Sequence, residues 1–162
     1  FYKSQEAAGS DLPHAPTAWE NKKVLISLSD KENEKDTVLY IGKTLQSLGF
    51  TLLATDGTAD FYNHNGIKCD VVNKIGAGRP DVLDSIMNKE VCLVINTPKA
   101  KRNYAEDRKT IRKACLKYKV AYITTLAGAK AAVQGIASVK NGNGGEGGVK
   151  SLQEYHKLIE EK

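Results

Sequence analysis

The stretch LLATDGTADF, residues 52–61, places two threonines around a glycine where an apolar run ends and a helical pattern begins. Thr55 closes the apolar run, Gly57 allows a ligand to approach the backbone closely, and Thr58 stands at the start of the helical pattern. The first turn of a helix leaves backbone N–H groups unpaired, and a phosphate group can satisfy them. The turn is therefore a candidate phosphate-binding loop; the alternative is that the two threonines only cap the helix.

Further polar residues follow the other apolar runs of the chain. Ser27 ends the first run and Lys35 follows it after a charged loop, while Lys74 and Asn96 come after two later runs. Lysine supplies charge without a fixed bidentate geometry, which suits a freely rotating phosphate monoester, and the Asn96 amide could recognise a sugar or a base edge. If all these runs are parallel strands, their ends meet at the edge where such sheets bind ligands. The alternative is that the lysines are solvated chain ends.

The elements that would position these residues alternate regularly between residues 22 and 140. Strand patterns cover residues 23–27, 51–55, 69–72, 91–96 and 120–125, and helical patterns cover residues 37–49, 59–66, 82–89, 107–119 and 126–137. Strands that alternate with helices through short loops predict an α/β three-layer sandwich, Rossmann-like, with a mainly parallel five-stranded central sheet. Residues 1–21 are predicted to be a linker, residues 141–150 a glycine-rich linker, and residues 151–162 a final helix.

The composition fits one soluble globular domain, with 162 residues, 41% hydrophobic residues and a net charge of +5. No apolar run is long enough to cross a bilayer, and no arginine-rich arm or aromatic-interleaved basic run indicates nucleic-acid binding. The spacing of Cys69, Cys92 and Cys115 fits neither a zinc site nor a disulfide framework, which favours reduced thiols and a cytoplasmic location. Because the chain starts at Phe1 and its only methionine is Met87, we expect it to be a segment of a larger protein.

Two short motifs resemble nucleotide loops but lack their context. The Gly-Lys-Thr tripeptide at residues 42–44 lies in a helical pattern instead of a loop between strand and helix. The stretch IGAGRPD, residues 75–81, has Asp81 where a dinucleotide fingerprint needs a third small residue. Neither motif predicts a nucleotide site by itself.

Several longer stretches closely resemble the C-terminal domain of the carbamoyl-phosphate synthase large chain, which has the methylglyoxal-synthase-like fold. They are LLATDGTADF, VNKIGAGRPDVLDSI, LVINTP, IRKACLKYKVAYITTLAGA and the closing SLQEYH. The similarity runs from about residue 22 to the end, and FYKSQEAAG at the start resembles the exit from the preceding synthetase domain. The resemblance implies a regulatory domain that binds nucleotide monophosphates of the UMP and IMP type.

The resemblance also implies which residues would bind the effector. Positions that contact the phosphate are matched by Lys35, Thr55, Thr58 and Lys74, with Lys31 as an alternative to Lys35 because the loop before Lys35 is long. Positions that contact the ribose and base are matched by Ser27, Asn96 and Asp107. No catalytic residue, metal site or cofactor is implied for this domain.

For the parent enzyme, the resemblance implies a cytoplasmic ligase that makes carbamoyl phosphate from glutamine or ammonia, bicarbonate and ATP, for pyrimidine and arginine biosynthesis. Its other modules would use ATP with Mg or Mn, and K, and would partner a small glutaminase subunit; homo-oligomers are possible. Two alternatives stay open. One is a methylglyoxal synthase-type lyase acting on dihydroxyacetone phosphate, which needs a catalytic aspartate where Arg79 and Pro80 stand, near Asp81. The other is a structural oligomerisation module.

Overall fold

A computed structural model describes residues 22–29, 31–97 and 105–140 of the chain. The predicted linkers at residues 1–21 and 141–150 and the predicted helix at residues 151–162 lie outside these ranges. Strands and helices alternate through the described part. In chain order they are β1 (Lys23–Leu28), α2 (Lys35–Ser47), β2 (Thr51–Thr55), α3 (Asp56–His64), β3 (Asp70–Val72), α4 (Val82–Met87), β4 (Val91–Thr97), α5 (Ala105–Tyr118), β5 (Ala121–Ile123) and α6 (Leu126–Lys140).

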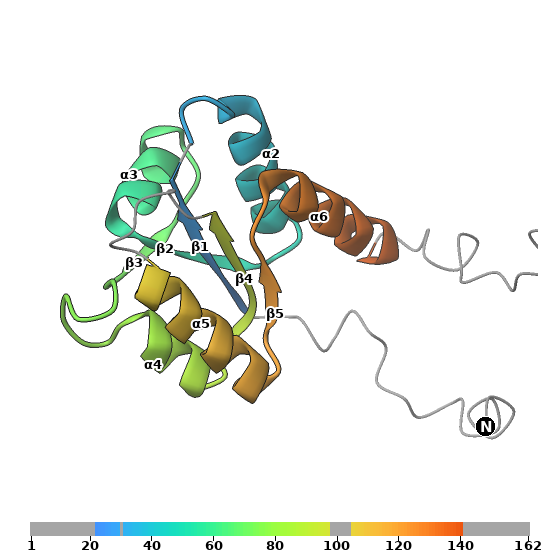
Figure 1. Ribbon diagram of the computed structural model, residues 1–162. Coiled ribbons are helices and arrows are strands. Elements are labelled where there is room, and N and C mark those ends of the chain that lie inside the picture. Colours follow the sequence, from blue (N-terminus) through green and yellow to red (C-terminus); the bar gives the residue numbers. More distant parts are fainter. Residues whose placement is uncertain (1–21, 30, 98–104, 141–162) are drawn as a thin grey trace, which may run out of the picture.

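The five strands form one sheet in the order β3-β2-β1-β4-β5, and every neighbouring pair is parallel. Helices α2, α3 and α6 cover one face, and α4 and α5 cover the other, as Figure 1 shows. The predicted three-layer α/β fold is therefore confirmed. The chain winds outward from β1 to β3, then returns to place β4 on the other side of β1. Sheets of this kind bind ligands outside the carboxyl ends of the strands where the winding reverses, here between β1 and β4.

The apolar pattern of each element explains its place in the layers. Val24, Leu25 and Ile26 of β1 are all buried, because a central parallel strand is covered on both faces. Helix α2 buries one side only, and its C-terminal end is held by the Lys140 amine of α6, which donates to the Leu48 carbonyl. This contact ties the ends of two helices that pack side by side on one face of the sheet.

The Gly-Lys-Thr tripeptide lies inside α2, as its helical surroundings predicted. Gly42 is buried there, and a Cβ at this position would lie 2.5 Å from Cε1 of the Tyr62 ring. Tyr62 is itself fully buried and donates from its hydroxyl to the Val38 carbonyl at 3.1 Å. The glycine therefore lets helices α2 and α3 pack closely and belongs to no phosphate loop.

The three cysteines are free thiols; Cys69 and Cys115 are buried, and Cys92 is half-buried. Burial raises the pKa of Cys69 to about 12, with a smaller contribution from the Asp70 charge, and burial raises the pKa of Cys115 to about 11. Both thiols therefore stay protonated at neutral pH. Within the described ranges, no group of three or more metal-binding side chains occurs, and none of the helices is both long and apolar enough to span a bilayer.

Candidate functional site

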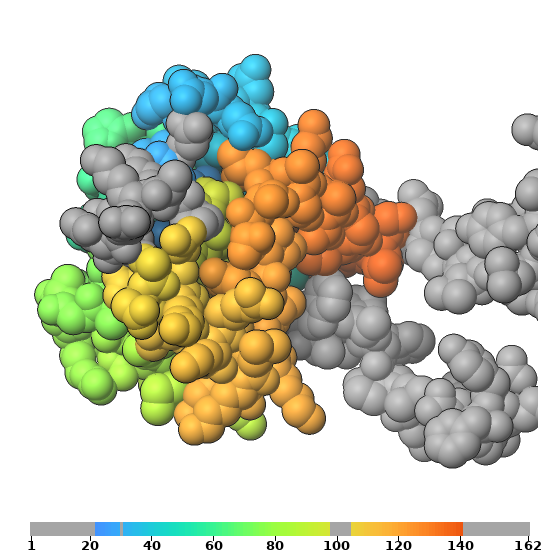
Figure 2. Space-filling view, viewed as in Figure 1, coloured from blue at the N-terminus to red at the C-terminus, as the bar shows by residue number. Residues whose placement is uncertain are grey.

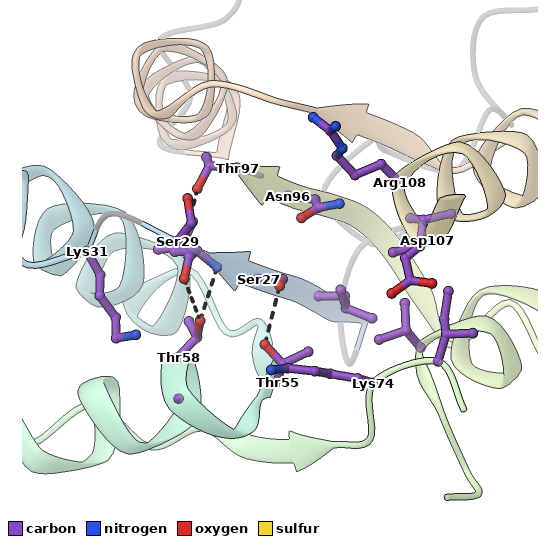
Figure 3. Close-up of a pocket in the computed structure, with 16 residues that line it drawn as sticks. Ser27, Ser29, Lys31, Thr55, Thr58, Lys74, Asn96, Thr97, Asp107 and Arg108 are labelled. Atoms are coloured by element: carbon purple, nitrogen blue, oxygen red, sulfur yellow. Dashed lines mark hydrogen bonds between the residues drawn. The ribbon is translucent and has the colours of Figure 1, made fainter. Parts of the chain in front are cut away.

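A cavity of about 220 Å³ opens at the carboxyl edge of the sheet, beside the β1–β4 switch (Figure 3). Side chains from the ends of β1, β2 and β4, from the segment after β3, and from the first turns of α3 and α5 meet there. Its wall comprises Leu25, Ser27, Leu28, Ser29, Lys31, Thr55, Gly57, Thr58, Lys74, Ile75, Val82, Asn96, Thr97, Asp107, Arg108 and Ile111.

Strand alternation produces a polar row along one wall of this cavity. Ser27 pairs with Asn96 between β1 and β4, and Thr55 follows Ala54, which pairs with Ile26. Two residues earlier on each strand, the same face is apolar and belongs to the core beneath α4 and α5. This face of the sheet therefore changes from apolar to polar at the last inward-facing residue of each strand. The Ser27 and Thr55 hydroxyls lie 3.3 Å apart there.

The two threonines of the TDGT turn have different roles from simple helix capping. Thr55 is the N-cap residue of α3, yet its side chain makes no capping hydrogen bond. The Thr58 hydroxyl accepts from the Leu28 N–H at 3.0 Å and lies 3.4 Å from the Leu28 carbonyl, to which it can donate. Thr58 therefore fixes the start of α3 against the end of β1. The first-turn N–H groups of α3 remain without a side-chain cap, as an anion site requires.

Lys31 and Lys74 line the cavity, whereas Lys35 does not. Lys35 is an exposed residue at the start of α2, so the structure does not bring it to the position that the sequence prediction gave it. The loop after β1 is long enough for Lys31 to reach the site instead. Its Nζ lies 3.5 Å from the place that a Cβ of Gly57 would occupy, beside the first turn of α3.

The opposite end of the cavity combines hydrogen-bonding groups with an apolar floor. Asn96 is almost fully buried and donates from Nδ2 to the Tyr122 hydroxyl at 3.3 Å, which leaves its oxygen as an acceptor. Asp107 belongs to the first turn of α5, and Figure 3 shows its carboxylate across the cavity from Thr55. Apolar side chains of the core beneath α4 and α5, namely Leu25, Val82 and Ile111, complete this end.

Six of the seven predicted site residues thus meet in one cavity: Ser27, Thr55, Thr58, Lys74, Asn96 and Asp107. The sequence prediction missed Ser29, Thr97 and Arg108. The Ser29 N–H donates to the Thr97 hydroxyl at 3.3 Å and ties the ends of β1 and β4 together. For Arg108 a usable signal existed. A helix that follows a parallel strand begins at the carboxyl edge of the sheet, and Arg108 lies near the start of the helix that follows β4.

The cavity carries more positive than negative charge. Lys31, Lys74 and Arg108 contribute three cationic groups to its wall, against the single carboxylate of Asp107. Within the described ranges, neither lysine takes part in an ion pair. An anionic ligand would therefore meet two lysine charges that no described carboxylate already neutralises.

Asp81, the nearest aspartate to the glycine-rich loop, lies outside the lining of this cavity and has a structural role. It is the N-cap of α4, and its carboxylate accepts from the N–H groups of Leu83 at 2.8 Å and Asp84 at 3.1 Å. The Asp84 carboxylate in turn accepts from the Asp81 N–H and pairs with Arg79 at 2.9 Å. This capping box uses Asp81 as an anchor for α4.

Comparisons with known proteins agree with this architecture. The profile of the "MGS-like domain" family matches residues 37–124, which is more than half of the chain. The chain is 47% identical over 156 residues to the carbamoyl phosphate synthase large chain of Archaeoglobus fulgidus, and the match covers 96% of this chain and 14% of that protein. It is 39% identical over 160 residues to the corresponding large chain of Xanthomonas axonopodis pv. citri, covering 99% of this chain and 14% of that protein.

A further relative indicates where such a segment lies. The "carbamoyl phosphate synthase large chain, C-terminal section" of Methanopyrus kandleri is 44% identical over 140 residues, covering 86% of this chain and 24% of that protein. The chain therefore spans between about one seventh and one quarter of the length of these three relatives. These matches, which agree with the fold, show that the chain belongs to the MGS-like domain family, in the form found in carbamoyl phosphate synthase large chains.

Proposed function

We propose that this chain is the regulatory domain of a carbamoyl-phosphate synthase large chain and that its cavity binds a nucleotide monophosphate of the UMP or IMP type. The observation that carries the proposal is the convergence of Lys31 and Lys74 with the uncapped first turn of α3 in one cavity. Two amines and a set of unpaired N–H groups match the three charged oxygens of a phosphate monoester.

The rest of the cavity suits the remainder of a nucleotide. Ser27, Asn96 and Asp107 offer hydroxyl, amide and carboxylate groups that can bind the hydroxyls of a ribose or the polar edge of a base. The apolar floor between them can contact the flat face of the sugar or base. The volume of about 220 Å³ is below the roughly 300–1,000 Å³ usual for small-molecule sites, so part of the nucleotide would extend to the rim.

Regulation then follows from linkage between this cavity and catalytic modules outside the chain. The effector shifts the enzyme only as far as it binds the active and inactive arrangements with different affinity. In this proposal, the parent is a cytoplasmic ligase that makes carbamoyl phosphate from glutamine or ammonia, bicarbonate and ATP. Its ATP, metal ions and glutaminase subunit belong to the other modules, and the isolated domain catalyses nothing.

Isothermal titration calorimetry of the 162-residue chain with UMP and with IMP tests the binding. We expect saturable binding of at least one nucleotide, weakened at least tenfold by Lys74→Ala, since a charge-assisted hydrogen bond contributes about 1.5–3 kcal/mol. Lys43→Ala removes the same charge from an exposed position of α2 outside the cavity wall and should leave the affinity within twofold. Absence of saturable binding at millimolar concentrations of both nucleotides would contradict the proposal.

The lyase alternative is tested by the same protein. We expect no conversion of dihydroxyacetone phosphate to methylglyoxal, because the candidate base Asp81 is occupied in capping α4. Asp81→Ala should instead lower the stability by about 0.5–2 kcal/mol, the usual effect of removing an N-cap, which urea unfolding can measure. Measurable turnover that disappears in Asp81→Asn, with the fold retained, would establish the lyase reading.

A further inference from the structure

A second hollow, of about 880 Å³, lies along the outer side of α5 and the neighbouring strand β5. The two elements pack against each other, and Figure 2 shows them on one face of the molecule in yellow and orange. Most of this hollow lies outside the nucleotide cavity, since only Arg108 contributes to both walls.

Strand β5 is an edge of the sheet within the described part of the chain, and β4 is its one neighbour there. An edge strand presents N–H and C=O groups on its outer side that can pair with another extended segment. Ala121 is exposed, and Tyr122 and Ile123 are partly exposed. Among the described residues, no strand pairs with the outer side of β5, so its backbone offers a place for the addition of a strand.

The walls of the hollow are basic. Between residues 108 and 124 the chain has no aspartate or glutamate and has six cationic residues: Arg108, Lys109, Arg112, Lys113, Lys117 and Lys119. Three of these, Arg108, Lys109 and Arg112, line the hollow directly. Lys109 pairs with Glu106 at 3.9 Å, but both side chains are mostly exposed, so this ion pair is weak.

The hollow also has apolar contact surface. Leu116 belongs to its wall and is 71% exposed. Val120 and Tyr122 lie beside it in the lining. An occupant with alternating acidic and apolar side chains would match both kinds of surface.

We infer that this groove binds an extended acidic segment of a protein, which adds to the sheet as a strand alongside β5. A second copy of the same surface is a poor occupant, because the like charges of two such grooves would repel each other. Nucleic acid fits less well. Among the described residues of the lining, Tyr122 is the one aromatic side chain and its hydroxyl is engaged by Asn96, so successive bases would find no platform on which to stack.

Fluorescence anisotropy with labelled decapeptides tests the inference. The probe is a peptide of alternating glutamate and valine. One control alternates glutamate with proline, which keeps the charge but removes half of the backbone donors, and another alternates lysine with valine. We expect the glutamate–valine peptide to bind the 162-residue chain at least tenfold more tightly than either control. It should also protect from exchange those amide protons of residues 121–123 that face away from β4.

Variants locate the binding on the molecule. Arg112→Glu and Lys109→Glu should each weaken binding at least fivefold, whereas Lys43→Glu, the same charge change on exposed α2, should alter it less than twofold. Two-dimensional NMR spectra of each variant verify its fold. Equal binding of the proline control, equal loss in Lys43→Glu, no binding at millimolar peptide, or tighter binding of a ten-nucleotide thymidine strand would each overturn the inference.

Discussion

At the scale of single residues, some side chains of the site stabilise the fold, whereas others are free to contact a ligand. The Thr58 hydroxyl is occupied by the backbone of Leu28, so this residue can offer a ligand mainly its own N–H group. The amines of Lys31 and Lys74 line the cavity and form no ion pair within the described ranges. The lysines are therefore the residues at which substitution should change affinity without disturbing the fold.

Separate replacement of Lys31 and Lys35, the two lysines that follow β1, tests which of them contacts the phosphate. Lys31→Ala removes an amine beside the first turn of α3 and should weaken UMP or IMP binding about 10- to 100-fold, since a charge-assisted hydrogen bond contributes about 1.5–3 kcal/mol. Lys35→Ala removes the same charge from an exposed residue outside the cavity wall and should change affinity less than twofold. Calorimetry on both variants measures the difference. A larger loss of affinity in Lys35→Ala than in Lys31→Ala would indicate that Lys35, and not Lys31, contacts the phosphate.

The sequence predicted those site residues that a strand end places in the structure. Thr55 and Asn96 lie where continuous apolar runs end, so their position at the carboxyl edge of the sheet follows from the pattern. Lys31 could not be chosen over Lys35 in the same way. Both belong to a charged segment between β1 and α2, and such a segment has no apolar periodicity that fixes which side chain turns inward.

At the scale of elements, the prediction succeeded wherever burial dictates the pattern. All five strands and all five helices between residues 22 and 140 were expected, and their order fixes the sheet edge at which the cavity lies. The differences are at the ends. Helix α5 begins at Ala105 instead of residue 107, and α6 continues to Lys140 instead of ending near residue 137. End residues are largely exposed, so burial does not constrain them.

The contact between α2 and α3 gives a paired test of packing against helix propensity. Gly42→Ala would place a methyl group 2.5 Å from the buried Tyr62 ring, and we expect overpacking of about 1–3 kcal/mol to outweigh the gain in helix propensity. Gly135→Ala in α6 meets no atom within 4 Å and should stabilise the protein by about 0.5–1 kcal/mol. Urea unfolding of both variants measures these shifts. A stabilised Gly42→Ala would mean that Tyr62 moves freely.

At the scale of the whole molecule, this basic domain has two hollows at different places on its surface. One lies at the carboxyl edge of β1, β2 and β4, and the other follows the outer side of α5 and β5. Both are positively charged, and the first combines the N-terminus of α3, which has no side-chain cap, with two lysine amines that form no ion pair within the described ranges. Net charge alone, +5 for the chain, could not have told a small-anion site from a surface for an acidic protein segment.

Ligand binding to the folded state should raise the stability of the entire domain. At a concentration 100 times the dissociation constant, a nucleotide adds about 2.7 kcal/mol, which corresponds to a rise in Tm of roughly 5–10 °C for a domain of this size. We expect this rise with UMP or IMP and a smaller one with inorganic phosphate. Uridine, which lacks the phosphate, and N-acetylglutamate, which carries only carboxylates, should leave Tm unchanged.

Comparison of the Tm shifts that these compounds cause shows which part of the cavity provides the binding energy. If the amines and the α3 turn dominate, Lys74→Ala should reduce the shift from inorganic phosphate and from UMP together, because both ligands lose the same charged contact. A shift with uridine equal to that with UMP would instead place the energy at the Asn96 and Asp107 end. In that case the phosphate cradle would not be the feature that selects the effector, and the chemistry proposed for Lys31 and Lys74 would be wrong.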